Sequence, residues 1–211
     1  AADIGSGAGF TAFGISPFAS TVFAIDLALP MLQYSIEGTT SRGLTNVVSV
    51  LGSAESLPFP NNSLGLVTCR LAAHHFNDIV VATREFARVL KSEGLLILVD
   101  TVVPEEPEAA AWMNNIELRR DPSHSCDLSV QQWLDVLTTN GFTIQETLSM
   151  TIPLEFEDWT QRSGTPRAVV EGLRTDFINA TNIVTDAFDI QPDEPLRFSW
   201  PCLALKARVA G

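Results

Sequence analysis

The chain opens with AADIGSGAGFTAF (residues 1–13), and this stretch decides the fold class. Three glycines, Gly5, Gly7 and Gly9, follow a short apolar segment that contains Asp3. Glycines in such a run adopt positive φ and let the backbone come close to a ligand. A glycine turn between a strand and a helix also directs backbone N–H groups and the positive end of the helix dipole toward a bound group. The stretch therefore predicts a nucleotide-like ligand at the end of a first strand.

Length and composition fit one folded globular domain. The chain has 211 residues, of which 45% are hydrophobic and 18% are charged. These values are typical of a chain that buries a core rather than of a disordered one. The formal net charge is −12. Because a chain this acidic repels a phosphate backbone, we expect no nucleic-acid partner. We expect a small, weakly charged or uncharged substrate instead. We draw no prediction of the oligomeric state.

The cysteines and the N-terminal apolar run bear on the compartment. Cys69, Cys126 and Cys202 form no CxxC pair, and an odd number of such thiols is typical of a reduced, cytoplasmic protein. Residues 4–25 carry no charged side chain, but several glycines and a proline interrupt them, and no basic residue precedes Arg42. We therefore predict neither a signal peptide nor insertion into a membrane.

Apolar segments typical of buried strands alternate with helical patterns in the first hundred residues. Continuous apolar strands, each followed by a helix, indicate a parallel sheet that is covered on both faces. We predict an open, mostly parallel Rossmann-like α/β sheet with helices on both faces. The expected strands are residues 1–4, 21–26, 46–52, 64–71 and 95–100, and the expected helices run from the glycine loop to about residue 19, over 29–38 with a stop at Gly38, and over 81–91.

The pattern changes after residue 104. We expect helices over 109–120 and 129–140, a polar loop between them, and strands over 142–150 and 197–209 that flank a helical insertion at 157–188. The last strand is expected to be antiparallel. Residues 1–211 are predicted to form a single domain, with substrate-side insertions at 104–135 and 155–190. The chain is expected to start within its first strand, with N-terminal helices missing.

The glycine loop allows two interpretations. A dinucleotide fingerprint, G-x-G-x-x-G, needs a third glycine where this chain has Phe10, a bulky residue at a helix–strand contact. The loop is instead D-x-G-x-G-x-G, and Asp26 ends the second strand, where a carboxylate accepts from the two hydroxyls of a ribose. An NAD(P)-binding oxidoreductase is therefore the alternative function, and Phe10 argues against it.

Several segments together resemble a known family. They are DIGSGAG (3–9), AIDLALPMLQYS (24–35), GSAESLPFPNNS (52–63), LVTCRLAAHHF (66–76) and REFARVLKSEGLLILVD (84–100). The chain resembles class I S-adenosylmethionine-dependent methyltransferases, in particular the type 11 group that includes the ubiquinone- and menaquinone-biosynthesis enzymes. The resemblance extends from residue 1 to about 150, and the last strands fit the family's closing hairpin. It implies methyl transfer from S-adenosylmethionine to a small organic acceptor.

The resemblance also implies cofactor-binding residues in four segments. They are Asp3, Gly5, Ser6, Gly7 and Gly9 under the methionine part, Asp26 and Leu27 against ribose and adenine, Ser53, Ala54 and Glu55 at the adenine edge, and Cys69 and Arg70 beside the sulfonium. Many relatives carry an aspartate at position 53, whereas this chain has a serine, whose hydroxyl accepts without charge.

Two histidines are the candidates for proton removal. His74 and His75 follow the fourth strand, and an unperturbed imidazole titrates near neutral pH. Adjacent residues on an extended segment point in opposite directions, so one would face the ligand while the other packs. The alternative is that both only line or support the pocket. We expect no metal, because His124 is the only other histidine and the cysteines are not clustered.

A second polar cluster follows the sheet strands. Arg119, Asp121 and His124 lie in a segment that leaves the carboxyl end of the strand at 95–100, where the crevice of an open α/β fold lies. They are candidates for closing over the substrate, and the alternative is a solvated loop with an ion pair. The large side chains Trp112, Met113 and Trp133 are expected in a core. A third alternative function is cofactor binding without turnover, caused by the short N-terminus.

Overall fold

The computed structural model describes residues 1–210, which form two compact units. The sheet unit comprises Ala1–Asp100, Leu134–Leu148 and the C-terminal residues from Ala204, and the aromatic unit comprises Thr101–Trp133 and Ser149–Leu203. No helix among residues 1–210 is long and apolar enough to cross a membrane. The three cysteines are free, with Cys69 and Cys202 buried and Cys126 exposed.

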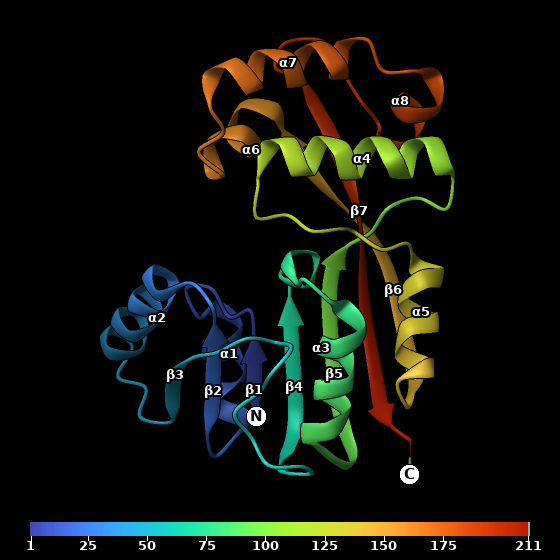
Figure 1. Cartoon of the computed structure of the whole chain (residues 1–211). Coiled ribbons are helices and arrows are strands. Elements are labelled where there is room, and N and C mark those ends of the chain that lie inside the picture. The colour runs from blue at the N-terminus through green and yellow to red at the C-terminus, as the bar shows by residue number, and fades with distance from the viewer. Residues whose placement is uncertain (211) are drawn as a thin grey trace. The chain divides into compact units, whose positions relative to one another are not determined.

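A seven-stranded sheet has the order β3-β2-β1-β4-β5-β7-β6. The strands are β1 (Ala2–Ile4), β2 (Val22–Asp26), β3 (Val47–Leu51), β4 (Leu64–Arg70), β5 (Leu90–Thr101), β6 (Phe142–Glu155) and β7 (Arg197–Val209). Strands β1 to β5 pair in parallel with one another, whereas β7 runs antiparallel to β5 (Figure 1). This confirms the predicted open, mostly parallel α/β sheet with an antiparallel C-terminal strand.

The position of β1 in this order creates a switch point. The chain runs from β1 to β2 and β3 on one side and returns to β4 and β5 on the other. Asp3 on β1 lies opposite Ala24 on β2 and Thr68 on β4. The carboxyl ends of β1, β2 and β4 therefore bring the glycine loop, Asp26 and Arg70 to one edge of the sheet. Ligands of open α/β sheets bind at such an edge.

The helices of the first hundred residues follow the predicted order. They are α1 (Phe10–Ile15), the short 3-10 helix η1 (Ser16–Phe18), α2 (Leu29–Ser41), the 3-10 helix η2 (Ala73–His75) and α3 (Ile79–Val89). Helix α3 begins where the Asp78 carboxylate accepts from the N–H groups of Val80 and Val81, both at 3.0 Å, which satisfies two of the unpaired donors of its first turn. Its Phe86 and Val89 are buried, as an amphipathic helix requires.

The predicted stop of α2 at Gly38 is wrong. The helix continues to Ser41, and Gly38 lies inside it. A Cβ atom at this position would lie 2.7 Å from the ring of Phe13 on α1. Gly38 is therefore explained by close packing of a ring on the helix rather than by helix termination.

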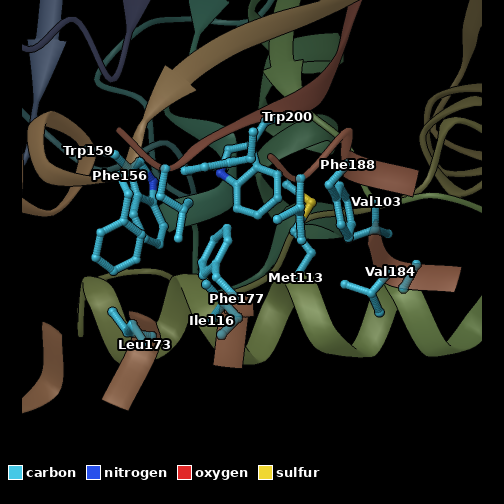
Figure 2. Packing of buried hydrophobic residues seen from close by; sticks show 14 residues of the cluster. Val103, Met113, Ile116, Phe156, Trp159, Leu173, Phe177, Val184, Phe188 and Trp200 are labelled. Atoms are coloured by element: carbon cyan, nitrogen blue, oxygen red, sulfur yellow. The ribbon is translucent and has the colours of Figure 1, made fainter. Parts of the chain in front are cut away.

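The aromatic unit contains α4 (Pro107–Arg120), α6 (Phe156–Arg162), α7 (Arg167–Ile178) and α8 (Asn182–Phe188), while α5 (Val130–Thr139) begins in this unit and ends in the sheet unit. The expected insertion at 157–188 is thus helical but is divided into three helices. Figure 2 shows its core, in which aromatic rings from α6, α7, α8 and β7 surround residues of α4. The ring of Phe177 lies 4.7 Å from that of Phe198 and 5.3 Å from that of Phe156.

The residues expected in a core are found there. Met113 and Trp133 are buried, and Trp112 packs against the aromatic cluster with its ring 4.9 Å from that of Phe177. Strands β5 and β6 are longer than predicted. Strand β5 starts at Leu90, directly after α3, and its pairing with β4 shifts register between Leu64 and Leu66.

Candidate active site

The glycine loop joins β1 to α1, and its three glycines serve different purposes. Gly5, Gly7 and Gly9 all have positive φ, of 65°, 52° and 89°. A Cβ atom on Gly5 would lie 2.3 Å from the Cβ of Ala72, and one on Gly9 would lie 2.7 Å from the ring of Phe13. Beside Gly7 no heavy atom lies within 4 Å of such a Cβ. Two glycines therefore permit internal packing, whereas Gly7 faces open space.

Phe10 does not lie where the sequence analysis expects it. Its side chain is 65% exposed at the first residue of α1, so its bulk meets no strand. The close contact is made one residue earlier, at Gly9. Phe10 therefore creates no steric conflict with a dinucleotide at a helix–strand contact.

Asp3 is buried beneath the loop. One carboxylate oxygen accepts from the Thr68 hydroxyl at 2.7 Å, and the other accepts from the Ala12 N–H at 3.1 Å. Burial raises the pKa of Asp3 to about 6, although these two hydrogen bonds and the charge of Arg70 act in the opposite direction. Since the carboxylate is directed at α1 and β4, Asp3 fixes the start of the helix that follows the loop.

Asp26 connects the end of β2 to the glycine loop. Its Oδ2 accepts from the Gly7 N–H at 2.7 Å, and its Oδ1 accepts from the Ala28 N–H at 2.8 Å. Each oxygen keeps further acceptor capacity, so the carboxylate can accept from two neighbouring hydroxyl groups as well. The side chain of Leu27, next to it, is 63% exposed and offers an apolar surface at the same edge.

Ser6 supplies an unusual polar atom. Its N–H donates to the Ile25 carbonyl at 2.8 Å, but its hydroxyl oxygen is buried and has no hydrogen-bond partner within residues 1–210. Unpaired buried hydroxyls are costly, so this one is well suited to a bound polar group. Together with the open side of Gly7, it shows that the loop fits a ligand with polar atoms.

The segment after β3 is closed by an internal network. The Ser53 hydroxyl is hydrogen-bonded to the Glu55 carboxylate, which also accepts from the Asn77 N–H at 2.9 Å. Burial alone would raise the pKa of Glu55, but the Ser53 hydroxyl and backbone N–H groups outweigh it and lower the pKa. Ala54, between them, is buried. Ser53 and Glu55 thus join the segment after β3 to the segment after η2.

The end of β4 carries one buried and one exposed side chain. Burial and the charges of Asp100 and Asp3 raise the pKa of the Cys69 thiol well above its usual value, so it is no thiolate at neutral pH. Arg70 is exposed, and its Nε donates to the Thr11 hydroxyl oxygen on α1 at 3.1 Å. Arg70 therefore lies beside the start of α1, directly after the glycine loop.

His74 is held by a buried carboxylate that the sequence analysis missed. The Nδ1 of His74 lies 2.6 Å from Oδ1 of Asp100, and its backbone N–H donates to Oδ2 at 3.1 Å. Asp100 is 1% exposed. The expectation that the two histidines point in opposite directions is wrong, because η2 is a helical turn and their ring centroids lie 4.3 Å apart. A carboxylate fixed to one imidazole nitrogen makes the other nitrogen the basic atom in the neutral ring.

The cluster Arg119, Asp121 and His124 lies in the aromatic unit, and its three side chains have different partners. Arg119 pairs with Asp176 at 2.5 Å, and Asp121 accepts from the Ser123 N–H and hydroxyl. His124 is buried, with its Nε2 3.3 Å from Oδ1 of Asn114. These contacts stabilise the end of α4 and the segment after it, and they do not join the three side chains into one group.

Comparison with known proteins agrees with this geometry. A family model for a methyltransferase domain matches residues 2–98. The uncharacterised methyltransferase YcgJ of Bacillus subtilis is 36% identical over 199 residues, which cover 93% of this chain and 79% of YcgJ. The chain belongs to the methyltransferase family.

Solved structures of methyltransferases share the fold over the whole chain. The crystal structure of YcgJ superposes with a TM-score of 0.96 at 33% identity and covers 100% of this chain and 91% of its own. A methyltransferase candidate from Bacillus halodurans gives a TM-score of 0.95 at 30% identity, covering 100% and 92%. A geranyl diphosphate methyltransferase in complex with S-adenosylmethionine shares the fold, with a TM-score of 0.69 at 13% identity, covering 99% and 77%.

Proposed function

We propose that this methyltransferase transfers the methyl group of S-adenosylmethionine to a small organic acceptor. The observation that carries the proposal is the glycine loop, where Gly7 faces open space while Asp26 holds its N–H at the switch point of the sheet. Membership of the family and the shared fold with an enzyme that binds S-adenosylmethionine support it. This cofactor supplies a methyl group on a positively charged sulfur, which needs little further activation.

The residues at the sheet edge would bind and orient the cofactor. Asp26 would accept from both ribose hydroxyls, and the exposed face of Leu27 would lie against the adenine. The Ser53–Glu55 network would support the adenine edge. The buried Ser6 hydroxyl would gain a partner on binding. The chain's contribution to the reaction would then be to align the acceptor with the methyl group and to exclude water.

A proton must leave many acceptors, and His74 would receive it. Asp100 holds Nδ1 of His74 and would stabilise the imidazolium that forms, and the ring of His75 lies beside it with the two centroids 4.3 Å apart. Positioned proton transfer contributes roughly 10²–10⁴-fold in rate. His74→Ala should therefore lower turnover by about that range and leave cofactor binding intact, whereas His75→Ala should have a smaller effect.

Turnover is measured as S-adenosylhomocysteine released from S-adenosylmethionine in the presence of a panel of small phenols, thiols and carboxylic acids. Equal turnover in His74→Ala and in the wild-type chain would exclude His74 as the base. Cofactor binding with no turnover on any acceptor would favour the alternative of a cofactor-binding protein.

Cofactor choice is tested by titration calorimetry with S-adenosylhomocysteine and NAD. We expect the first to bind and the second not to. Asp26→Ala should weaken the binding of S-adenosylhomocysteine by roughly 1.5–3 kcal/mol, the usual contribution of hydrogen bonds to a charged group. Glu37→Ala, which removes an exposed carboxylate from α2, is the matched control and should change nothing. Preferential binding of NAD would reverse the assignment in favour of the oxidoreductase.

A further inference from the structure

Arg70 is the feature of the sheet edge that the proposed function leaves without a defined task. It is exposed at the last residue of β4, and Thr11 orients it through its Nε. No carboxylate of residues 1–210 lies within ion-pair distance of it. Asp3 is close enough for the charge of Arg70 to lower its pKa, but both Asp3 oxygens are already bonded to Thr68 and Ala12. The two terminal nitrogens of the guanidinium are therefore available for an anionic group.

The strand order indicates which part of the cofactor this group would be. The ends of β3 and β2 carry Ser53, Glu55 and Asp26, which would hold the adenosine part. The end of β4 lies on the opposite side of β1, so a ligand that extends across the glycine loop brings its amino-acid part there. This part of the cofactor carries a carboxylate. A guanidinium presents parallel N–H groups that match a carboxylate in two-point geometry.

We propose that Arg70, oriented by the Thr11 hydroxyl, binds the methionyl carboxylate of the cofactor and so selects ligands that carry the amino-acid part. The inference rests on the proposed function. Asp3 and Asp26 place negative charge on this edge, which disfavours a carboxylate unless a cation offsets it. Thr11 is the positioning residue, because its hydroxyl oxygen accepts from Nε of Arg70 and leaves the two terminal nitrogens for the ligand.

The test compares two ligands that differ only in the carboxylate. Titration calorimetry measures S-adenosylhomocysteine and its decarboxylated analogue against the full chain and its Arg70→Gln variant. Loss of a charge-assisted pair in Arg70→Gln should lower the affinity for S-adenosylhomocysteine roughly 10- to 100-fold and leave the affinity for the analogue unchanged. Arg70→Lys should recover part of the loss. Arg84→Gln is the matched control, because the exposed Arg84 of α3 also donates through Nε to a neutral side-chain oxygen, that of Asn140.

The variants Thr11→Val and Thr11→Ser test whether the Thr11 hydroxyl orients the Arg70 guanidinium or only supports the fold. The valine variant should bind only the ligand with the carboxylate more weakly, and the serine variant should bind both ligands as the wild-type chain does. Equal weakening of both ligands in Arg70→Gln, or no weakening of either, would overturn the role of Arg70 while the cofactor assignment stands. A wild-type chain that binds neither ligand would overturn the proposed function itself, and this inference with it.

Discussion

The two units each bury a carboxylate, and they satisfy it in different ways. In the sheet unit, Asp3 is 1% exposed and accepts from a threonine hydroxyl and a backbone N–H, both neutral donors. In the aromatic unit, Glu117 is 5% exposed and accepts from the Arg120 guanidinium at 2.7 Å and from two indole N–H groups, of Trp159 and Trp200. One buried acid therefore has a cation against it and the other does not.

This difference concerns how much of the negative charge of each buried acid its own hydrogen-bond partners neutralise. Because no cation is hydrogen-bonded to Asp3, burial raises its pKa to about 6, and the charge of the nearby Arg70 offsets this only in part. Glu117 links α4 to α6 and β7 through the partners it bonds. A buried acid with a raised pKa beside an open glycine loop is what the proposed cofactor site predicts, whereas Glu117 lies inside a ring cluster and supports packing.

The largest expected effect is at Glu117. Glu117→Leu leaves the Arg120 guanidinium without its partner and two indole N–H groups without acceptors, so it should lower the free energy of unfolding by about 3–5 kcal/mol. Urea unfolding followed by tryptophan fluorescence measures this. The double variant with Arg120→Met removes both charges and should recover part of the loss. A single variant as stable as the wild-type chain would show that Glu117 does not hold the core.

The next effect concerns the pH dependence caused by Asp3. Since its folded pKa of about 6 exceeds the unfolded value, Asp3 contributes stability below pH 3.8 that is lost as pH rises through about 6. Asp3→Asn keeps both hydrogen bonds, with its amide donating to Thr68, but cannot ionise. The free energy of unfolding of the Asp3→Asn variant, relative to that of the wild-type chain, should therefore rise by about 3 kcal/mol between low and neutral pH.

Urea unfolding of both chains from about pH 3 to pH 7.5 measures this difference, because the other titrating groups are common to both. A difference that does not change over that range would mean that Asp3 does not ionise with a raised pKa.

The smallest effects distinguish two glycines of one loop. Gly5→Ala introduces a Cβ that clashes with Ala72 and should lower the free energy of unfolding by roughly 1–3 kcal/mol. Gly7→Ala meets no atom and should cost only about 1 kcal/mol, for its positive φ. The order should reverse for binding, where Gly7→Ala should weaken S-adenosylhomocysteine more than Gly5→Ala does. Thermal unfolding and calorimetry on both variants check this, and an equal loss of affinity would contradict an open ligand side at Gly7.

Local patterns in the sequence predict the sheet and its loop well. Alternating apolar strands and helices fix the order of elements through β5, because each element is encoded by its own residues. The glycine loop and Asp26 are also local, and the structure brings them to one edge as parallel strands require.

Features that depend on distant residues could not be predicted in the same way. Gly38 interrupts a helical pattern, but its packing against Phe13 is visible only once α1 and α2 are placed. The turn that brings the two histidine rings together replaces an extended segment that the pattern favours. The aromatic core combines rings from α4, α6, α7, α8 and β7 that share no common period in the sequence.

Asp100 could have been found from the sequence. It lies one residue before the end of β5, the strand next to β4, and His74 follows the end of β4 by four residues. Because the carboxyl ends of neighbouring parallel strands meet, an acid that ends one strand and a histidine just beyond the next are expected to be close.

The hydrogen bond from Gly7 to Asp26 has a kinetic consequence. It closes the glycine loop onto β2 through the protein's own atoms, so the conformational entropy of ordering the loop is lost during folding and not during binding. A cofactor therefore meets a preorganised surface, and its association should follow a single concentration-dependent phase without a slow rearrangement. The same bond couples loop to strand, so amide hydrogen exchange at Gly7 should be as slow in the free protein as in the complex.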